Sequence, residues 1–165
     1  GEIKKISEET LRLLTKGSKV CLVIARIFNV YGEEQKDSFV IPHILNQLNN
    51  AEILLGNLND YRDYIYVDDA VSALSLLNNT VLPLENNIYN IGTSKPNCVN
   101  DILKAIEKST NKKLNIKTEN SRMRFDENVS EISDIKKIMK LGWEPKFSLE
   151  QGLKICTENF KNKKK

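Results

Sequence analysis

The chain has 165 residues, of which 40% are hydrophobic and 28% are charged, and its formal net charge is +3. These values are typical of one globular domain and exclude a disordered segment. No apolar run is long enough to span a bilayer, and the first residues lack the charged-then-apolar order of a secretion signal. Four of the last five residues are lysines, so a solvated tail is favoured over nucleic-acid binding.

The cysteine and histidine content argues against disulfides and metal sites. Cys21, Cys98 and Cys156 are odd in number and far apart, and two of them lie in apolar patterns. We therefore predict buried, reduced thiols and a cytoplasmic protein. His43 is the single histidine and no cysteine pair has ligand spacing, so we predict no metal site.

The predicted elements alternate between helices and strands. Residues 2–15 carry Ile and Leu at roughly helical spacing, which predicts an amphipathic helix. Residues 20–27 form an apolar run that only Arg26 interrupts, which is typical of a central parallel strand covered on both faces. A helix is predicted within residues 38–48. The pattern as a whole indicates an α/β fold with a mainly parallel sheet.

The remaining elements follow in the same alternating order. The short predicted strands are 53–55, 63–67, 88–91 and 114–117, and the predicted helices run from Asp68 to about 77 and over 101–109, 134–139 and 149–160. Asp68 and Asn100 are expected to act as N-caps. Ser148 and Gln151 have the spacing of a capping box.

Six short motifs occur in a fixed order along nearly the whole chain. They are Arg26-Ile-Phe-Asn-Val-Tyr-Gly32, Leu55-Gly-Asn57 leading to Arg62-Asp-Tyr64, Val67-Asp-Asp69, Tyr89-Asn-Ile-Gly92, the Arg122–Glu127 turn with Asp134–Lys137, and Leu141–Pro145 followed by Ser148–Leu153. In this order they resemble the second half of the extended short-chain dehydrogenase/reductase family. That family comprises nucleotide-sugar epimerases, dehydratases and reductases.

Two positions depart from the family pattern. The family usually has proline after Tyr-Gly, where this chain has Glu33, and we expect a looser loop there. Phe125 replaces a proline in the arginine-rich turn.

The resemblance leads one to expect a glycine-rich dinucleotide loop and a catalytic Tyr-x-x-x-Lys pair. None of the seven glycines has the Gly-x-x-Gly-x-x-Gly spacing, and no tyrosine has a lysine four residues later. We therefore expect the chain to begin just after the catalytic lysine of a larger enzyme and to be inactive alone.

The resemblance also implies a division of the chain. Residues 1–30, 54–68 and 89–111 would form a partial Rossmann-like, doubly wound parallel sheet that belongs to an NAD(P)-binding domain. Residues 31–53, 69–88 and 112–165 would form an interleaved small substrate-binding lobe.

Arginines are the candidate ligands of a diphosphate. Arginine binds phosphate oxygens in a bidentate way that lysine cannot, which selects Arg62, Arg122 and Arg124. The resemblance implies this role for Arg62 and for Arg124. A solvated surface arginine is the alternative for each of the three.

Asn29 ends a predicted strand, at the edge where open α/β sheets bind ligands. The resemblance implies that Asn29 contacts the sugar or the diphosphate; the alternative is a turn asparagine that stabilises its own backbone. The same resemblance implies that the backbone of Ile27 and Phe28 faces the nicotinamide ring of NAD or NADP.

Four further positions are candidate substrate contacts, two of them by the family resemblance. Leu55 matches a residue that packs on the nucleobase, and Glu127 matches an acidic contact with the ribose. Val40 and Ile41 either line the substrate pocket or pack in the core.

Two other features have a structural interpretation. We interpret Asp68 and Asp69 as one helix cap and one carboxylate favoured by the helix dipole, rather than as an acid–base pair. Trp143 is expected in the core.

The implied reaction of the whole enzyme is oxidation at the sugar C4 by bound NAD or NADP, followed by epimerisation, dehydration or reduction. The motifs at 55–58 and 122–127 favour a GDP-sugar, while UDP-, dTDP- and CDP-sugars stay open, as does a homo-oligomer. The alternative function is a non-catalytic nucleotide-sugar-binding or protein-interaction module. Neither function requires nucleic acid or a membrane.

Overall fold

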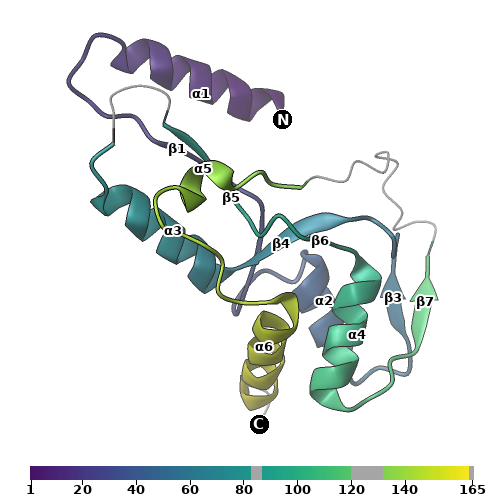
Figure 1. Cartoon of the computed structure of the whole chain (residues 1–165). Coiled ribbons are helices and arrows are strands. Elements are labelled where there is room, and N and C mark those ends of the chain that lie inside the picture. Colours follow the sequence, from purple (N-terminus) through teal and green to yellow (C-terminus); the bar gives the residue numbers. More distant parts are fainter. Residues whose placement is uncertain (83–86, 120–131, 164–165) are drawn as a thin grey trace.

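The structure is a computed structural model that describes residues 1–82, 87–119 and 132–163 (Figure 1). Its elements in chain order are α1 (Glu2–Thr15), β1 (Ile24–Ile27), β2 (Asn29–Tyr31), α2 (Val40–Asn46), β3 (Ile53–Leu55), β4 (Arg62–Tyr66), α3 (Val67–Asn79), β5 (Ile88–Ile91), β6 (Pro96–Asn97), α4 (Val99–Thr110), β7 (Ile116–Thr118), α5 (Lys136–Met139) and α6 (Leu149–Lys163). The predicted α/β fold is confirmed.

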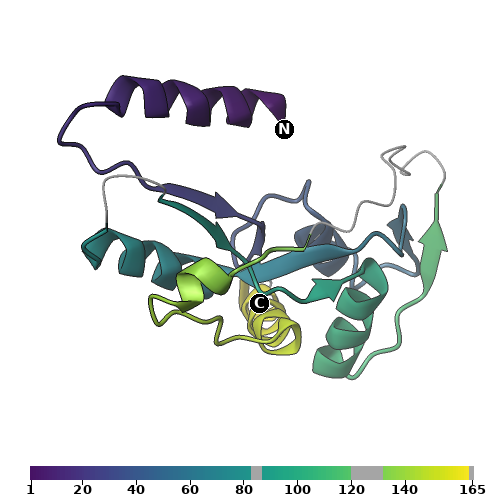
Figure 2. The same ribbon diagram turned by 45° about the horizontal axis from the view of Figure 1, so that its top comes forward.

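Strand pairing is mainly parallel, as the alternation of elements predicted. β1 pairs with β5, β2 with β4, and β3 with β7, all parallel, and only β6 joins β4 in the antiparallel sense. Phe28 alone separates β1 from β2, and its N–H donates to Ile91 O at 3.0 Å. At this point the chain therefore changes its pairing partner from β5 to β4 (Figure 2).

Two apolar clusters hold the elements together. The first joins β2, α2, β3, α4 and α6 and includes Ile44, Ile102 and Leu153, each fully buried. The second joins β4, α3, β5 and α5 and includes Trp143, as expected. The Trp143 Nε1–H donates to Ser72 Oγ at 2.9 Å, which satisfies its one polar group.

Helix α1 has the predicted bounds but buries none of its residues. Ile3 is 81% exposed and Leu14 is 74% exposed. An ion pair links α1 to β1: Glu8 Oε2 and Arg26 Nη2 lie 2.6 Å apart. The hydrogen bond from Arg26 lowers the pKa of the Glu8 carboxyl. In Figures 1 and 2, α1 lies apart from the other helices.

The strand predicted over residues 20–27 was too long. The strand begins only at Ile24, which is the first residue that pairs with β5, opposite Ile88. Val20 is 59% exposed, and β1 pairs with β5 alone in the part of the chain that the structure describes.

Two predicted helix caps are wrong and one is confirmed. α3 begins at Val67 directly after β4, without a side-chain cap, so Asp68 lies inside its first turn. α4 begins at Val99, so Asn100 lies within the helix and is not its N-cap. Asp101 Oδ2 accepts a hydrogen bond from Cys98 N at 3.0 Å. The Ser148–Gln151 capping box forms, with bonds of 2.8 and 3.2 Å.

The prediction of buried, reduced thiols holds for two of the three cysteines. No disulfide forms, and Cys98 and Cys156 are buried, but Cys21 is exposed because it precedes the start of β1. The described residues contain no group of three or more His, Cys, Asp or Glu side chains that could hold a metal ion. Within those same ranges, no helix is both long and apolar enough to cross a membrane.

Candidate functional site

A cleft of about 1040 Å³ lies beside β1, β2, β3 and the start of β4. Seven predicted site residues line it: Ile27, Phe28, Asn29, Val40, Ile41, Leu55 and Arg62. The structure thus brings together residues from four separate segments of the chain. The other three predicted site residues, Arg122, Arg124 and Glu127, lie outside the described residues.

The strand register explains why Asn29 and Arg62 share this cleft. Asn29 pairs with Tyr64 in the parallel β2–β4 ladder, so Arg62 lies two residues before its partner position. The Asn29 Nδ2 also donates to Asp63 O at 3.3 Å. Asn29 therefore opens β2 rather than ending the preceding strand, and its amide is anchored across the ladder.

Arg62 is held by a carboxylate of the same cleft wall. Its Nε and Nη2 donate to Asp60 Oδ2 at 3.0 and 2.8 Å. The two side chains are 26% and 31% exposed, so the pair lies at the cleft surface. Asp60 was not among the predicted site residues, although it stands two residues before the motif arginine.

The apolar side of the cleft is also part of the core. Leu55 and Ile41 are 4% and 2% exposed, and both belong to the first apolar cluster. The neighbouring Leu54 N donates to Gln47 Oε1 at 2.9 Å, and His43 Nε2 lies 3.2 Å from Leu54 O. Contacts from α2 thus fix the end of β3, where Leu55 meets the cleft.

Gln35 contributes a polar group that the sequence analysis did not identify. Its Nε2 donates to Val30 O at 2.9 Å. Its Oε1 is buried and has no hydrogen-bond partner within the described residues, and Gln35 lines the cleft. A buried acceptor without a partner is unfavourable, which makes this oxygen a candidate to accept a hydrogen bond from a ligand.

Tyr64 lines the cleft as a neutral phenol. Burial, and then the charge of nearby Asp60, raise the pKa of its hydroxyl to about 12. At neutral pH this hydroxyl is therefore protonated. It can donate a hydrogen bond, but it is not a general base.

Asp63, the residue after Arg62, is a fully buried hub that the sequence analysis missed. Its carboxylate accepts hydrogen bonds from Thr93 N at 2.8 Å, Ser94 N at 2.9 Å and Ser133 N at 3.1 Å, and from the hydroxyls of Thr93 and Ser133. The hub ties β4 to the turn after β5 and to residue 133. The feature of the sequence that could have indicated this hub is a carboxylate within an apolar strand.

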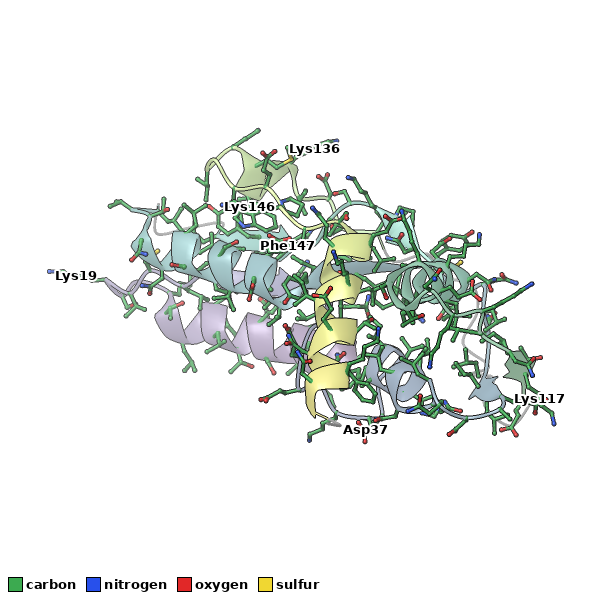
Figure 3. The ribbon with its side chains drawn as sticks, turned by 90° about the horizontal axis from the view of Figure 1, so that it is seen from below. Lys19, Asp37, Lys117, Lys136, Lys146 and Phe147 are labelled. Atoms are coloured by element: carbon green, nitrogen blue, oxygen red, sulfur yellow. The ribbon has the colours of Figure 1, made fainter. Side chains whose placement is uncertain are left out.

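Asp68 and Asp69 both lie in the first turn of α3, where the helix dipole favours carboxylates as predicted, and Asp69 has a further structural role. Asp69 is 1% exposed, and its carboxylate accepts from Lys146 N at 2.9 Å and Phe147 N at 3.0 Å. Figure 3 labels Lys146 and Phe147, which lie where the chain passes between α3 and α6. Asp69 therefore fastens this connection to α3.

Comparisons with known proteins agree with the fold and the motifs. The family model for GDP-mannose 4,6 dehydratase matches residues 1–156. A putative UDP-glucose 4-epimerase from Methanocaldococcus jannaschii is 31% identical over 169 aligned residues, covering 98% of this chain and 53% of that protein. The solved UDP-glucose 4-epimerase of Thermotoga maritima, with UDP-glucose, is 30% identical, with a TM-score of 0.79 over 98% of this chain and 53% of that one.

A further solved structure supports the fold alone. RMD from Pseudomonas aeruginosa, complexed with NADPH, has a TM-score of 0.86 at 22% identity and covers 98% of this chain and 56% of that one. The chain spans about half the length of the curated relatives it matches. The match over nearly all of the chain confirms the resemblance, and the chain belongs to the GDP-mannose 4,6 dehydratase family of extended short-chain dehydrogenases/reductases.

Proposed function

We propose that this chain supplies the nucleotide-sugar-binding part of an NAD(P)-dependent epimerase, dehydratase or reductase that acts at the sugar C4. The observation that carries the proposal is the shared position of Asn29, Leu55 and Arg62 on one cleft, in a chain of this family. The cleft volume of about 1040 Å³ is at the upper end of the range usual for small-molecule sites.

The cleft offers a different group to each part of a nucleotide sugar. The Arg62 guanidinium suits the diphosphate, because its planar donors can fork across two phosphate oxygens. The apolar Leu55 suits the nucleobase. Asn29 and the buried Gln35 Oε1 suit sugar hydroxyls, which can donate to an amide oxygen.

The cofactor in this proposal is NAD or NADP, with the backbone of Ile27 and Phe28 toward the nicotinamide. When bound, the cofactor supplies reversible hydride transfer. The described residues of the chain bind and orient the substrate, and Tyr64 stays protonated beside it. Residues 1–30, 54–68 and 89–111 belong to the cofactor domain, and 31–53, 69–88 and 112–165 to the substrate lobe.

Turnover in this proposal requires a tyrosine–lysine pair that this sequence does not carry, so the isolated chain binds substrate without converting it. Arg122 and Arg124 join Arg62 as diphosphate ligands, and Glu127 contacts the ribose. A GDP-sugar is the favoured substrate, by the motifs at 55–58 and 122–127 and by the matching family model.

Calorimetric titration of the chain with GDP-mannose, UDP-glucose, dTDP-glucose and CDP-glucose tests the proposal. We expect saturable binding of at least one nucleotide sugar and no C4 keto product on addition of NAD or NADP. Absence of binding to all four would overturn the proposed site. Formation of a keto product would overturn the claim that the chain alone is inactive.

A further inference from the structure

We infer that Glu33 is a positioning residue that ties the cleft loop (residues 32–39) to α6, so that a change on α6 outside the cleft alters ligand affinity. The ligand in this inference is the nucleotide sugar of the proposed function. The hydrogen bonds of Glu33 do not depend on that proposal.

The Glu33 carboxylate joins two elements that are distant in sequence. Tyr66 Oη lies 3.0 Å from both Glu33 oxygens and donates to them, and Asn159 Nδ2 donates to Oε1 at 2.7 Å. Tyr66 ends β4, and Asn159 belongs to α6, 126 residues after Glu33. These bonds were not part of the expectation that glutamate in place of proline loosens the loop, and they would oppose such loosening.

The donors to Glu33 are held in place by packing. Tyr66 is 3% exposed, and its ring centroid lies 4.8 Å from that of Phe147 and 5.6 Å from that of Tyr31. A side chain at Gly152 would collide with the Tyr31 ring, which shows how closely α6 approaches β2. The Tyr66 hydroxyl and α6 are thus fixed relative to β2, which lines the cleft.

The charges around Glu33 favour this arrangement. Burial, and then the hydrogen bond to Glu33, raise the pKa of Tyr66 well above its ordinary value, so the hydroxyl keeps its proton. Burial, and then the charge of Glu33, also raise the pKa of the Cys156 thiol to about 12. The thiol is therefore neutral and does not repel the carboxylate at physiological pH.

The loop needs such a tie because its local conformation is unfavourable. Glu34 has a φ of 66°, in the left-handed region that side-chain-bearing residues rarely adopt. Directly after it, Gln35, Asp37, Ser38 and Phe39 line the cleft. The family proline would restrict the backbone locally. In this chain, bonds from Glu33 to β4 and α6 hold the turn instead.

The test compares Glu33→Ala, Glu33→Gln and Asn159→Ala with Glu158→Ala. Glu158 is the neighbouring α6 residue, and it pairs with Lys154 rather than with Glu33. Peptide-resolved hydrogen exchange of residues 34–39 is measured without ligand, and affinity for GDP-mannose and UDP-glucose is measured by titration. Thermal unfolding of each variant is measured in parallel.

We expect Glu33→Ala to accelerate exchange of the loop and to weaken nucleotide-sugar binding, each about tenfold, because charge-assisted bonds are lost. Glu33→Gln keeps one acceptor oxygen and should give smaller changes. Asn159→Ala removes one bond of the set and should give changes of about threefold. Glu158→Ala should leave both quantities unchanged.

Three outcomes would contradict part of this account, and they separate positioning of the loop by Glu33 from stabilisation of the fold alone. If Glu33→Ala and Asn159→Ala lower the melting temperature but leave loop exchange at the wild-type value, Glu33 does not hold the loop and the inference fails. If the loop loosens without any loss of affinity, the link to the cleft fails. A wild-type chain that binds neither sugar contradicts the proposed function, while the exchange data still decide whether Glu33 holds the loop.

Discussion

Arg62 donates from Nε and Nη2 to a single oxygen of Asp60, at 3.0 and 2.8 Å, and both residues line the cleft. Asp60 thus occupies an edge of the guanidinium that a phosphate could also use. A bound diphosphate would share Arg62 with this carboxylate or displace it. Asp60 therefore determines how readily the Arg62 guanidinium can bind an anion.

Asp60→Asn should strengthen nucleotide-sugar binding by up to about fivefold at low salt. The substitution removes a competing negative charge from a partly exposed pair, whose own energy is about 0.2–1 kcal/mol. The measurement is calorimetric titration at two salt concentrations. Asp37→Asn is the control, because Asp37 lines the same cleft from the loop after β2. Weaker binding in Asp60→Asn would instead show that Asp60 orients Arg62 for its ligand.

Asp63→Ala should lower the free energy of unfolding by about 3–5 kcal/mol, because buried N–H and O–H donors of residues 93, 94 and 133 lose their acceptor. Urea denaturation measures the change. Asp134→Ala is the control: it removes an exposed carboxylate that accepts a hydrogen bond from Lys136 N, and it should cost about 1 kcal/mol or less. Equal effects of the two substitutions would contradict the role of Asp63 as a hub.

Much of the fold was predictable from the sequence because it depends on local patterns. The helix at 2–15 and the strands at 53–55 and 88–91 have the predicted bounds, and the capping box at Ser148 forms. The motifs also selected five residues that line one cleft, namely Ile27, Phe28, Asn29, Leu55 and Arg62. Periodicity and turn chemistry carry this information within a few residues.

The parts that were missed depend on contacts between distant segments. Asp63 bonds to Ser133, 70 residues away, and Asp69 bonds to Lys146, 77 residues away. Local propensity favoured Asp68 as a cap, but α3 begins where β4 ends. The partners of Glu33 on β4 and α6 likewise could not be inferred from the residues that neighbour it in sequence.

Stability should fall at alkaline pH. Burial raises the pKa of Tyr64 from 10.0 to about 12, so the unfolded chain loses this proton first. Its contribution is complete below pH 10.0 and is lost as the pH rises toward about 12, at up to about 1.4 kcal/mol per pH unit. Urea midpoints measured between pH 9 and about 11.5 should decline less steeply in Tyr64→Phe. An unchanged slope would contradict this assignment.

Gln35→Met should weaken binding of a nucleotide sugar about fivefold while leaving binding of the corresponding nucleoside diphosphate unchanged. Methionine has a similar length but lacks the Oε1 acceptor, whose loss removes one hydrogen bond worth about 1 kcal/mol. Parallel titrations with GDP-mannose and GDP separate the two contributions. Equal losses for both ligands would show that Gln35 supports the loop rather than the sugar.

The affinity of Arg62→Ala for a nucleotide sugar is the most direct test that this cleft binds a diphosphate. Loss of a bidentate guanidinium should cost about 2–4 kcal/mol and weaken binding about 30-fold or more. Arg62→Lys should recover only part of the loss, because an ammonium cannot fork across two oxygens. Arg12→Ala, which removes an exposed arginine paired with Glu9 on α1, should bind as the wild type does. Unchanged affinity in Arg62→Ala would contradict the diphosphate site and leave Arg62 a surface residue paired with Asp60.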